Sequence, residues 1–140
     1  MNKLLLFLLL ILPTFLLAQS SFSDPKQECT GPVFTVVEQL PALKISREAF
    51  EDSLTTALRT KQFSLKNGQI TYRFIVTRQS NILDLRVDSG GISKQRILKE
   101  IILHFADQWA PAKQNGHIVC AHVRLKITFT DERLAISIFQ

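Results

Sequence analysis

Trp109 to Gly116 reads WAPAKQNG and lies between a helical pattern and a long strand pattern. The stretch predicts a helix that ends on Trp109, because Pro111 lacks the N–H that a continuing helix would use. Asn115-Gly116 is typical of a two-residue hairpin turn, after which a strand begins. No catalytic group lies in these eight residues. They therefore indicate architecture, with Trp109 as a core residue or, alternatively, as a ligand platform.

Apolar and polar residues alternate after the turn, which predicts a long strand with one buried face. The apolar face comprises Val119, Ala121, Val123, Leu125, Ile127 and Phe129. The other face carries Cys120, His122, Arg124, Lys126 and Thr128. A turn at residues 131–133 and a short final strand follow, the strand indicated by Leu134, Ile136 and Ile138.

The residues before WAPAKQNG predict two helices and three strands. A helix from Arg47 to Thr60 begins after the N-cap Ser46. Two alternating runs, Ile70 to Thr77 and Leu83 to Asp88, predict a β-hairpin that ends at Ser89-Gly90-Gly91. A short strand from Val33 to Leu40 precedes Pro41, and an apolar stripe predicts the second helix. That stripe consists of Ile97, Leu98, Ile101, Ile102, Phe105 and Trp109.

The order of these elements is strand, helix, strand, strand, helix, strand, strand. Strands with one apolar face pair antiparallel, and the helices then cover that face. The sequence therefore predicts an α+β fold, a two-layer sandwich of a small antiparallel sheet with two helices on one face. The domain is expected over residues 33–140, after a flexible lead-in over residues 19–32.

The first 18 residues resemble a secretory signal peptide, with Lys3, an apolar stretch from Leu4 to Leu17 and the small Ala18. Cleavage after Ala18 would leave a periplasmic protein. The alternative is an inner-membrane anchor, although the apolar stretch is shorter than the roughly 20 residues of a spanning helix.

Charge and cysteine content bound the partners. The chain has 17 basic and 12 acidic residues; without Lys3 there are 16 and 12, a net charge of +4. The excess is scattered, so we expect no nucleic-acid partner. In an oxidising compartment Cys29 and Cys120 form a disulfide or remain two separate thiols, and their positions in the sequence leave both open.

Three other groups of side chains are candidate sites. Cys120 and His122 share a strand face while His117 points away, so with His104 they fall short of a zinc site. Asp84, Asp88, Glu100 and Asp107 show no arrangement of nucleophile, base and orienting group. Ser89-Gly90-Gly91 lacks the Lys and Ser/Thr of a phosphate loop. We expect no enzyme activity, no metal and no cofactor.

Several short motifs, in order, resemble the C-terminal domain of the TonB family of periplasmic energy transducers. They are VVEQLP at 36–41, Asn67-Gly68-Gln69-Ile70, the strand ending in Phe74 and Val76, and ILDLRV at 82–87. The most specific is Trp109, Pro111 and Ala112 with Asn115, Gly116 and the following strand. The resemblance extends over about Val33 to Phe139.

The resemblance implies a domain that binds the extended TonB box of outer-membrane receptors by strand addition at an exposed sheet edge. The strand matching the family's peptide-pairing strand gives the expected site residues: Val119, Cys120, Ala121, His122, Val123, Arg124, Leu125 and Lys126. This chain departs from the family in its cleavable N-terminal segment, its lack of a long proline-rich linker, and KQFSLK at 61–66. The alternative is a structural or regulatory envelope domain without receptor binding or energy transduction, with a homodimer through the sheet edges.

Overall fold

The computed structural model describes residues 28–63, 66–91, 95–131 and 133–140. Over these residues the fold has two α-helices and eight strands, and a 3₁₀ turn lies at Ala106–Gln108. The helices are α1 (Arg47–Thr60) and α2 (Gln95–His104). The strands are β1 (Val33–Phe34), β2 (Ala42–Leu43), β3 (Gly68–Val76), β4 (Ile82–Gly90), β5 (Trp109–Ala110), β6 (Ala112–Gln114), β7 (His117–Phe129) and β8 (Leu134–Phe139).

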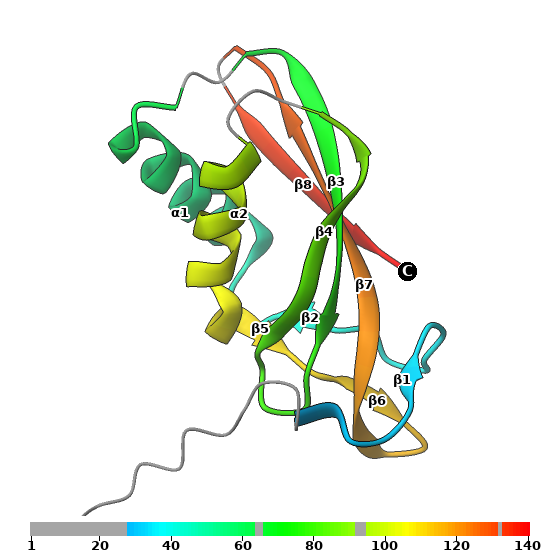
Figure 1. The fold of residues 1–140 in the computed structure, drawn as a ribbon. Coiled ribbons are helices and arrows are strands. Elements are labelled where there is room, and N and C mark those ends of the chain that lie inside the picture. Colours follow the sequence, from blue (N-terminus) through cyan, green and yellow to red (C-terminus); the bar gives the residue numbers. More distant parts are fainter. Residues whose placement is uncertain (1–27, 64–65, 92–94, 132) are drawn as a thin grey trace, which may run out of the picture.

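The long strands form one twisted sheet, and both helices lie on the same side of it (Figure 1). Strand order along the sheet is β1-β7-β3-β4, while β6 and β8 also pair with β7. β2 and β5 form a separate two-stranded sheet near the ends of β3 and β7. The fold class predicted from the sequence, a two-layer α+β sandwich, is confirmed.

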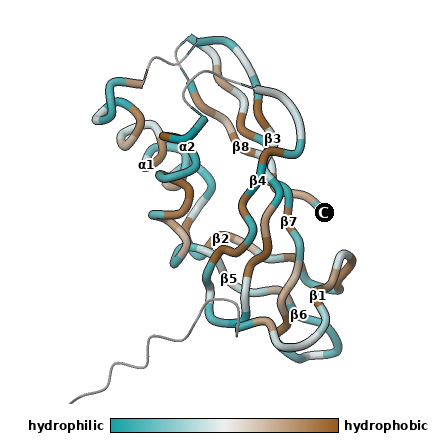
Figure 2. Tube along the Cα trace, in the orientation of Figure 1, coloured by the Kyte–Doolittle hydropathy of each residue, from teal (hydrophilic) through white to brown (hydrophobic). Residues whose placement is uncertain are grey.

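The core fills the space between the helices and the sheet. Phe50, Leu54 and Leu58 on α1 are fully buried, as are Leu98 and Ile102 on α2. Figure 2 shows apolar segments on both the helices and the strands. The predicted apolar face of β7 is confirmed from Ala121 onward, since Ala121, Val123, Leu125, Ile127 and Phe129 are all buried, but Val119 at its start is only half-buried.

Helix α1 has the predicted bounds and the predicted cap. The Ser46 hydroxyl accepts a hydrogen bond from the Ala49 N–H at 3.1 Å, which satisfies one of the free donors of the first turn. The hairpin of β3 and β4 is also confirmed, but β4 extends to Gly90, beyond the predicted end at Asp88. Gly90 has φ +78°, and a Cβ there would approach the Gln69 carbonyl oxygen to 2.5 Å, so only glycine fits this backbone.

The alternation predicted for Leu83, Leu85 and Val87 is wrong. The β3–β4 register shifts on both sides of the Arg86–Val87 segment, and Asp84 has φ +55°. Each bulge adds a residue and changes which side the following side chain faces. Leu85 and Ile82 are therefore buried, whereas Val87 is 39% exposed.

The second helix ends earlier than predicted. α2 stops at His104, a 3₁₀ turn follows, and Trp109 has the extended conformation of a strand residue. Trp109 pairs with Leu43 in the two-stranded sheet. The apolar spacing predicted that the helix extends to Trp109. The 3₁₀ turn and the short strand keep the Trp109 side chain on the same buried side as the apolar residues of α2, so the spacing alone does not distinguish the two arrangements.

The strand predicted from Val33 to Leu40 is also shorter than expected. β1 comprises two residues and pairs parallel with β7, at Cys120 and Ala121. On β7, the ladder with β8 starts at Arg124, so little of the strand remains for β1. The residues after Phe34 leave β7, and Val36 is 77% exposed. Gln39 then forms an isolated antiparallel bridge to Lys113 of β6.

A disulfide joins Cys29 to Cys120, which resolves the two alternatives left by the sequence. Glu28 is buried and accepts hydrogen bonds from Thr77 Oγ1 at 2.6 Å and Asn81 Nδ2 at 2.5 Å. The end of the predicted lead-in, residues 28–32, is therefore held against the sheet. The predicted signal peptide and residues 19–27 lie outside the described residues, among which no helix is long and apolar enough to span a bilayer.

Candidate functional site

The predicted peptide-pairing strand lies inside the sheet and not at its edge. Residues Ala121 to Phe129 of β7 pair with β3 on one side. On the other side, Arg124 to Phe129 pair with β8, and Cys120 and Ala121 pair with β1. The expectation that Val119 to Phe129 presents an open edge is wrong, because the C-terminal strand and the N-terminal segment satisfy its peptide groups.

The expected site residues divide into two sets. Ala121, Val123 and Leu125 point into the core, and Cys120 is closed by its disulfide. His122, Arg124 and Lys126 lie on the opposite side of the sheet and are half-buried. Val119, near the start of β7, is also half-buried. An incoming peptide would contact the main chain of β7 only if β8 or β1 left the sheet.

The outer edge of β8 is protected by a helix side chain. The Ile136 N–H points away from β7 and donates to Glu51 Oε1 on α1 at 2.8 Å. A charge-assisted bond of this kind satisfies an edge amide that would otherwise accept a further strand. The β8 edge is therefore a poor site for strand addition.

β4 is the terminal strand on the other side of the sheet. It pairs with β3 alone, and along the described chain its outer peptide groups have no backbone partner. The two register shifts and the ion pair between Asp84 and Arg86 interrupt this edge. Arg86 and Val87, which pair with Arg73 and Tyr72, form the regular segment between the shifts.

A groove of about 340 Å³ lies between the β4 edge and α2. Its wall on α2 carries the cations Arg96 and Lys99, and Arg86 belongs to the β4 segment that forms the opposite wall. The Tyr72 hydroxyl donates to the Gln95 carbonyl at 3.3 Å, and burial raises the pKa of Tyr72 to about 12, so the phenol stays neutral. We call this surface the edge groove, lined by Tyr72, Leu85, Arg86, Val87, Gln95, Arg96 and Lys99.

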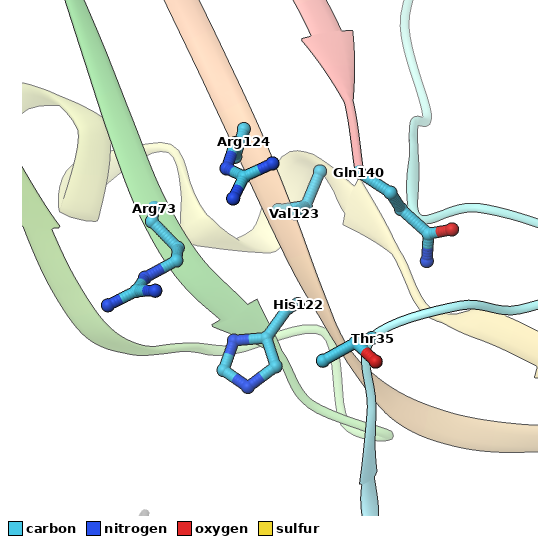
Figure 3. Close-up of a pocket in the computed structure, with 6 residues that line it drawn as sticks. All are labelled: Thr35, Arg73, His122, Val123, Arg124 and Gln140. Atoms are coloured by element: carbon cyan, nitrogen blue, oxygen red, sulfur yellow. The ribbon is translucent and has the colours of Figure 1, made fainter. Parts of the chain in front are cut away.

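A second cavity, of about 180 Å³, lies where the ladder along β7 is interrupted between β1 and β8. Thr35 follows β1 and Gln140 follows β8, so the ends of these two strands meet there. Figure 3 shows Arg73, Arg124 and His122 around one side of the opening and Thr35 and Gln140 on the other. We call it the ladder pocket, lined by Thr35, Arg73, His122, Val123, Arg124 and Gln140.

The electrostatics of the ladder pocket favour a neutral His122. Desolvation by burial lowers the pKa of His122, and the charges of Arg73 and Arg86 lower it further against an opposing effect of Asp84. The imidazole therefore adds no positive charge near neutral pH. The permanent charges at this pocket are those of the arginines.

The residues that resemble the TonB motif have structural places. Phe74, Val76, Trp109 and Ala112 are fully buried, and Gly68 begins β3. Asn115 and Gly116 form the tight turn between β6 and β7 with φ values of +50° and +73°, as a two-residue hairpin loop requires. Pro111 separates β5 from β6. None of these residues lines the edge groove or the ladder pocket.

The side chains weighed for catalysis are separated by the fold. Asp84 pairs with Arg86, Asp88 pairs with Arg124, and Glu100 pairs with Arg96 at 3.8 Å on α2. Asp107 lies in the 3₁₀ turn, where its carbonyl accepts from Lys44 Nζ. In the described ranges, no three His, Cys, Asp or Glu residues are grouped to hold a metal ion.

Sequence reasoning missed the edge groove and the ladder pocket. Both depend on which strands become neighbours, and pairing partners carry no local signal. The basic residues of α2 were the one available indication of the groove, since Arg96 and Lys99 lie on its polar side. No protein-family model matches the chain, and neither the curated proteins nor the solved structures include a significant match to it.

Proposed function

We propose that this chain is a non-enzymatic interaction domain of the cell envelope that binds an extended segment of a protein partner by strand addition at β4. The motifs that resemble the TonB C-terminal domain suggest the partner class, a TonB-dependent outer-membrane receptor or a related transport protein. The signal-peptide pattern suggests a periplasmic location. Strand addition draws affinity from main-chain hydrogen bonds, so it needs an open edge and little side-chain chemistry.

The observation that carries the proposal is the open outer edge of β4. β7 is enclosed by β3 on one side and by β1 and β8 on the other, and Glu51 caps the β8 edge. β4 has a partner on one side only. An extended chain can therefore add to the β4 edge without displacing another element.

The charges of the edge groove favour an acidic segment. Arg96 and Lys99 line its α2 wall, and Glu100, the carboxylate partner of Arg96, lies in an exposed ion pair at 3.8 Å. Exposed pairs of this kind contribute little and exchange readily with an incoming carboxylate. Charge complementarity of this type raises the association rate and selects among partners.

A second candidate function is a structural or regulatory envelope domain that keeps the fold without receptor binding. The two register shifts in β4 favour it, because bulges are one way in which proteins discourage addition to an edge. In this case the β4 edge binds no peptide, or it pairs with a second copy of the chain. A binding measurement separates the two candidates.

The test uses a proline at an outward-facing amide. The Thr77 N–H donates to the Asn81 carbonyl, on the β4 side of β3. Because peptide groups alternate in direction along a strand, the N–H groups of every second residue before Thr77, including Arg73, also point toward β4. The N–H of Tyr72 points toward β7 instead. Tyr72 and its register partner Val87 are therefore a pair without mutual hydrogen bonds, and the Val87 N–H points outward. Val87→Pro removes that donor at an edge position where proline is tolerated, and Val87→Thr keeps it.

The probes are capped peptides tiling the periplasmic N-terminal segment of an outer-membrane transport receptor, measured by calorimetry against the mature protein. We expect at least one peptide to bind, Val87→Thr to retain its affinity, and Val87→Pro to lose about tenfold or more. Equal binding by all three proteins would exclude the β4 edge. Absence of binding by every peptide would leave the structural candidate in its place.

A further inference from the structure

Three arginines face one another across the sheet on the side away from the helices. Arg73 on β3 is the register partner of Arg86 on β4 and also of Arg124 on β7. Neighbouring strands lie about 4.8 Å apart. Like charges placed directly opposite are unfavourable. We call Arg86, Arg73 and Arg124 the arginine row.

The two outer arginines have carboxylate partners and the central one has none. Asp84 pairs with Arg86, and Asp88 Oδ2 lies 3.1 Å from Arg124 Nε. Within the described ranges Arg73 makes no ion pair and no side-chain hydrogen bond. With Lys126 next along β7, this surface carries four permanent cations against two carboxylates. The fold therefore holds a guanidinium at the centre of a positive surface without neutralising it.

The ladder pocket lies beside this central arginine and contains unused polar atoms. His122 Nδ1, Arg124 Nε and Gln140 Nε2 are buried and have no hydrogen-bond partner in the described part of the protein. For Arg124 the distance to Asp88 is that of an ion pair, but the direction of its Nε–H does not meet the carboxylate. Buried donors without acceptors are unfavourable, and an oxygen anion in this pocket would accept hydrogen bonds from Arg124 Nε and Gln140 Nε2.

We propose that the ladder pocket binds a carboxylate of an acidic segment in a protein partner, held by Arg73 and Arg124 with Gln140. The guanidinium fork matches the planar carboxylate, and the cavity of about 180 Å³ accommodates one such group. This site is separate from the β4 edge and does not require strand addition there.

The length of the arginine row favours a segment with several carboxylates over one small anion. From Arg86 to Arg124 the row spans two strand spacings, about 10 Å. In an extended chain, side chains on one face recur about every 7 Å, so acidic residues at alternate positions reach the pocket and the next arginine together. A single free anion contacts one end of this row only.

His122 provides a readout at the site itself. Its pKa is lowered by burial and by Arg73 and Arg86, and raised by Asp84; Arg124 lies next along its own strand, and Thr35 and Gln140 add no charged side chain. A bound carboxylate offsets the field of the arginines, so binding should raise the pKa of His122. A residue that merely supports the fold would not produce this response.

The experiment titrates the full mature protein by NMR with a capped peptide carrying Asp at alternate positions, its Asn counterpart and inorganic phosphate. We expect saturable shifts at residues 73, 122, 124 and 140 and an upward shift of the His122 pKa with the Asp peptide. Arg73→Gln should lower that affinity about tenfold or more, because it removes charge-assisted hydrogen bonds. Arg59→Gln, on the exposed end of α1, should leave it unchanged.

Measuring the stability of Arg73→Gln distinguishes a loss of binding from a loss of folding. Removing the unneutralised central charge should leave the denaturation midpoint equal to wild type or raise it; a lower midpoint would show that Arg73 supports the fold, and would overturn the proposal. Equal binding of the Asn peptide would also overturn it. So would phosphate that binds as tightly as the Asp peptide, since the ligand would then be a free anion.

Discussion

Trp109 is the residue at which the two layers of the molecule meet. Its indole is fully buried between Phe50 on α1, with ring centroids 6.3 Å apart, and Phe74 on β3, at 5.1 Å. Both contacts are edge-to-face, the geometry that aromatic quadrupoles favour. The indole Nε1 has no hydrogen-bond partner in the described residues, so Trp109 acts through volume and shape.

Replacing Trp109 by Ala should lower the free energy of unfolding by about 3–5 kcal/mol, because it leaves a large cavity between α1 and β3. Trp109→Phe should lose less, since the lost N–H has no partner to leave unpaired. Trp109 is the single tryptophan, so unfolding in guanidinium should be followed by far-UV circular dichroism. An unchanged midpoint for Trp109→Ala would contradict the burial of this side chain.

At the scale of elements, the periodic segments could be predicted and their neighbours could not. The bounds of α1 followed from the Ser46 cap and the stripe of Phe50, Leu54 and Leu58, all local signals. The alternating residues of β4 do not reveal the bulge at Asp84, because the bulge arises from the way β4 pairs with β3. The interior position of β7 in the sheet could not be predicted either, since it depends on pairing with the distant strands β1 and β8.

Glu51 illustrates how a helix closes the edge of a strand, and it gives a matched pair of variants. Glu51→Ala should lower stability by about 1–3 kcal/mol, because the Ile136 N–H loses its acceptor at a partly buried position. Glu51→Gln keeps a carbonyl acceptor and should lose less. Equal midpoints for the two variants in urea unfolding would show that the hydrogen bond contributes nothing beyond the side chain's volume.

The whole molecule is held together by a covalent link between its first described residues and its central strand. The disulfide joins residues 91 positions apart, and Glu28 packs beside it against the β3–β4 turn. Such a bond persists in an oxidising compartment, which agrees with the periplasmic location that we propose. The sequence allowed this bond but could not require it, since spacing in the chain says nothing of spacing in the fold.

Cys29→Ala combined with Cys120→Ala should lower the free energy of unfolding by about 4–5 kcal/mol, the loop-entropy value for a closed loop of this length. Reduction of the wild type should give a similar loss, which controls for the changed side chains. Calorimetry under matched conditions measures both. A loss below about 1 kcal/mol would mean that the segment around Cys29 is held without the bond.

The open outer edge of β4 is the centre of the functional account, and amide hydrogen exchange tests it most directly. With a bound receptor peptide, the account predicts slower exchange at the outward N–H of Val87, with protection along β7 and β8 unchanged. Lost protection in β8, with protection on β7 retained and none gained at Val87, would contradict it, because the peptide would then have displaced β8 and paired with β7.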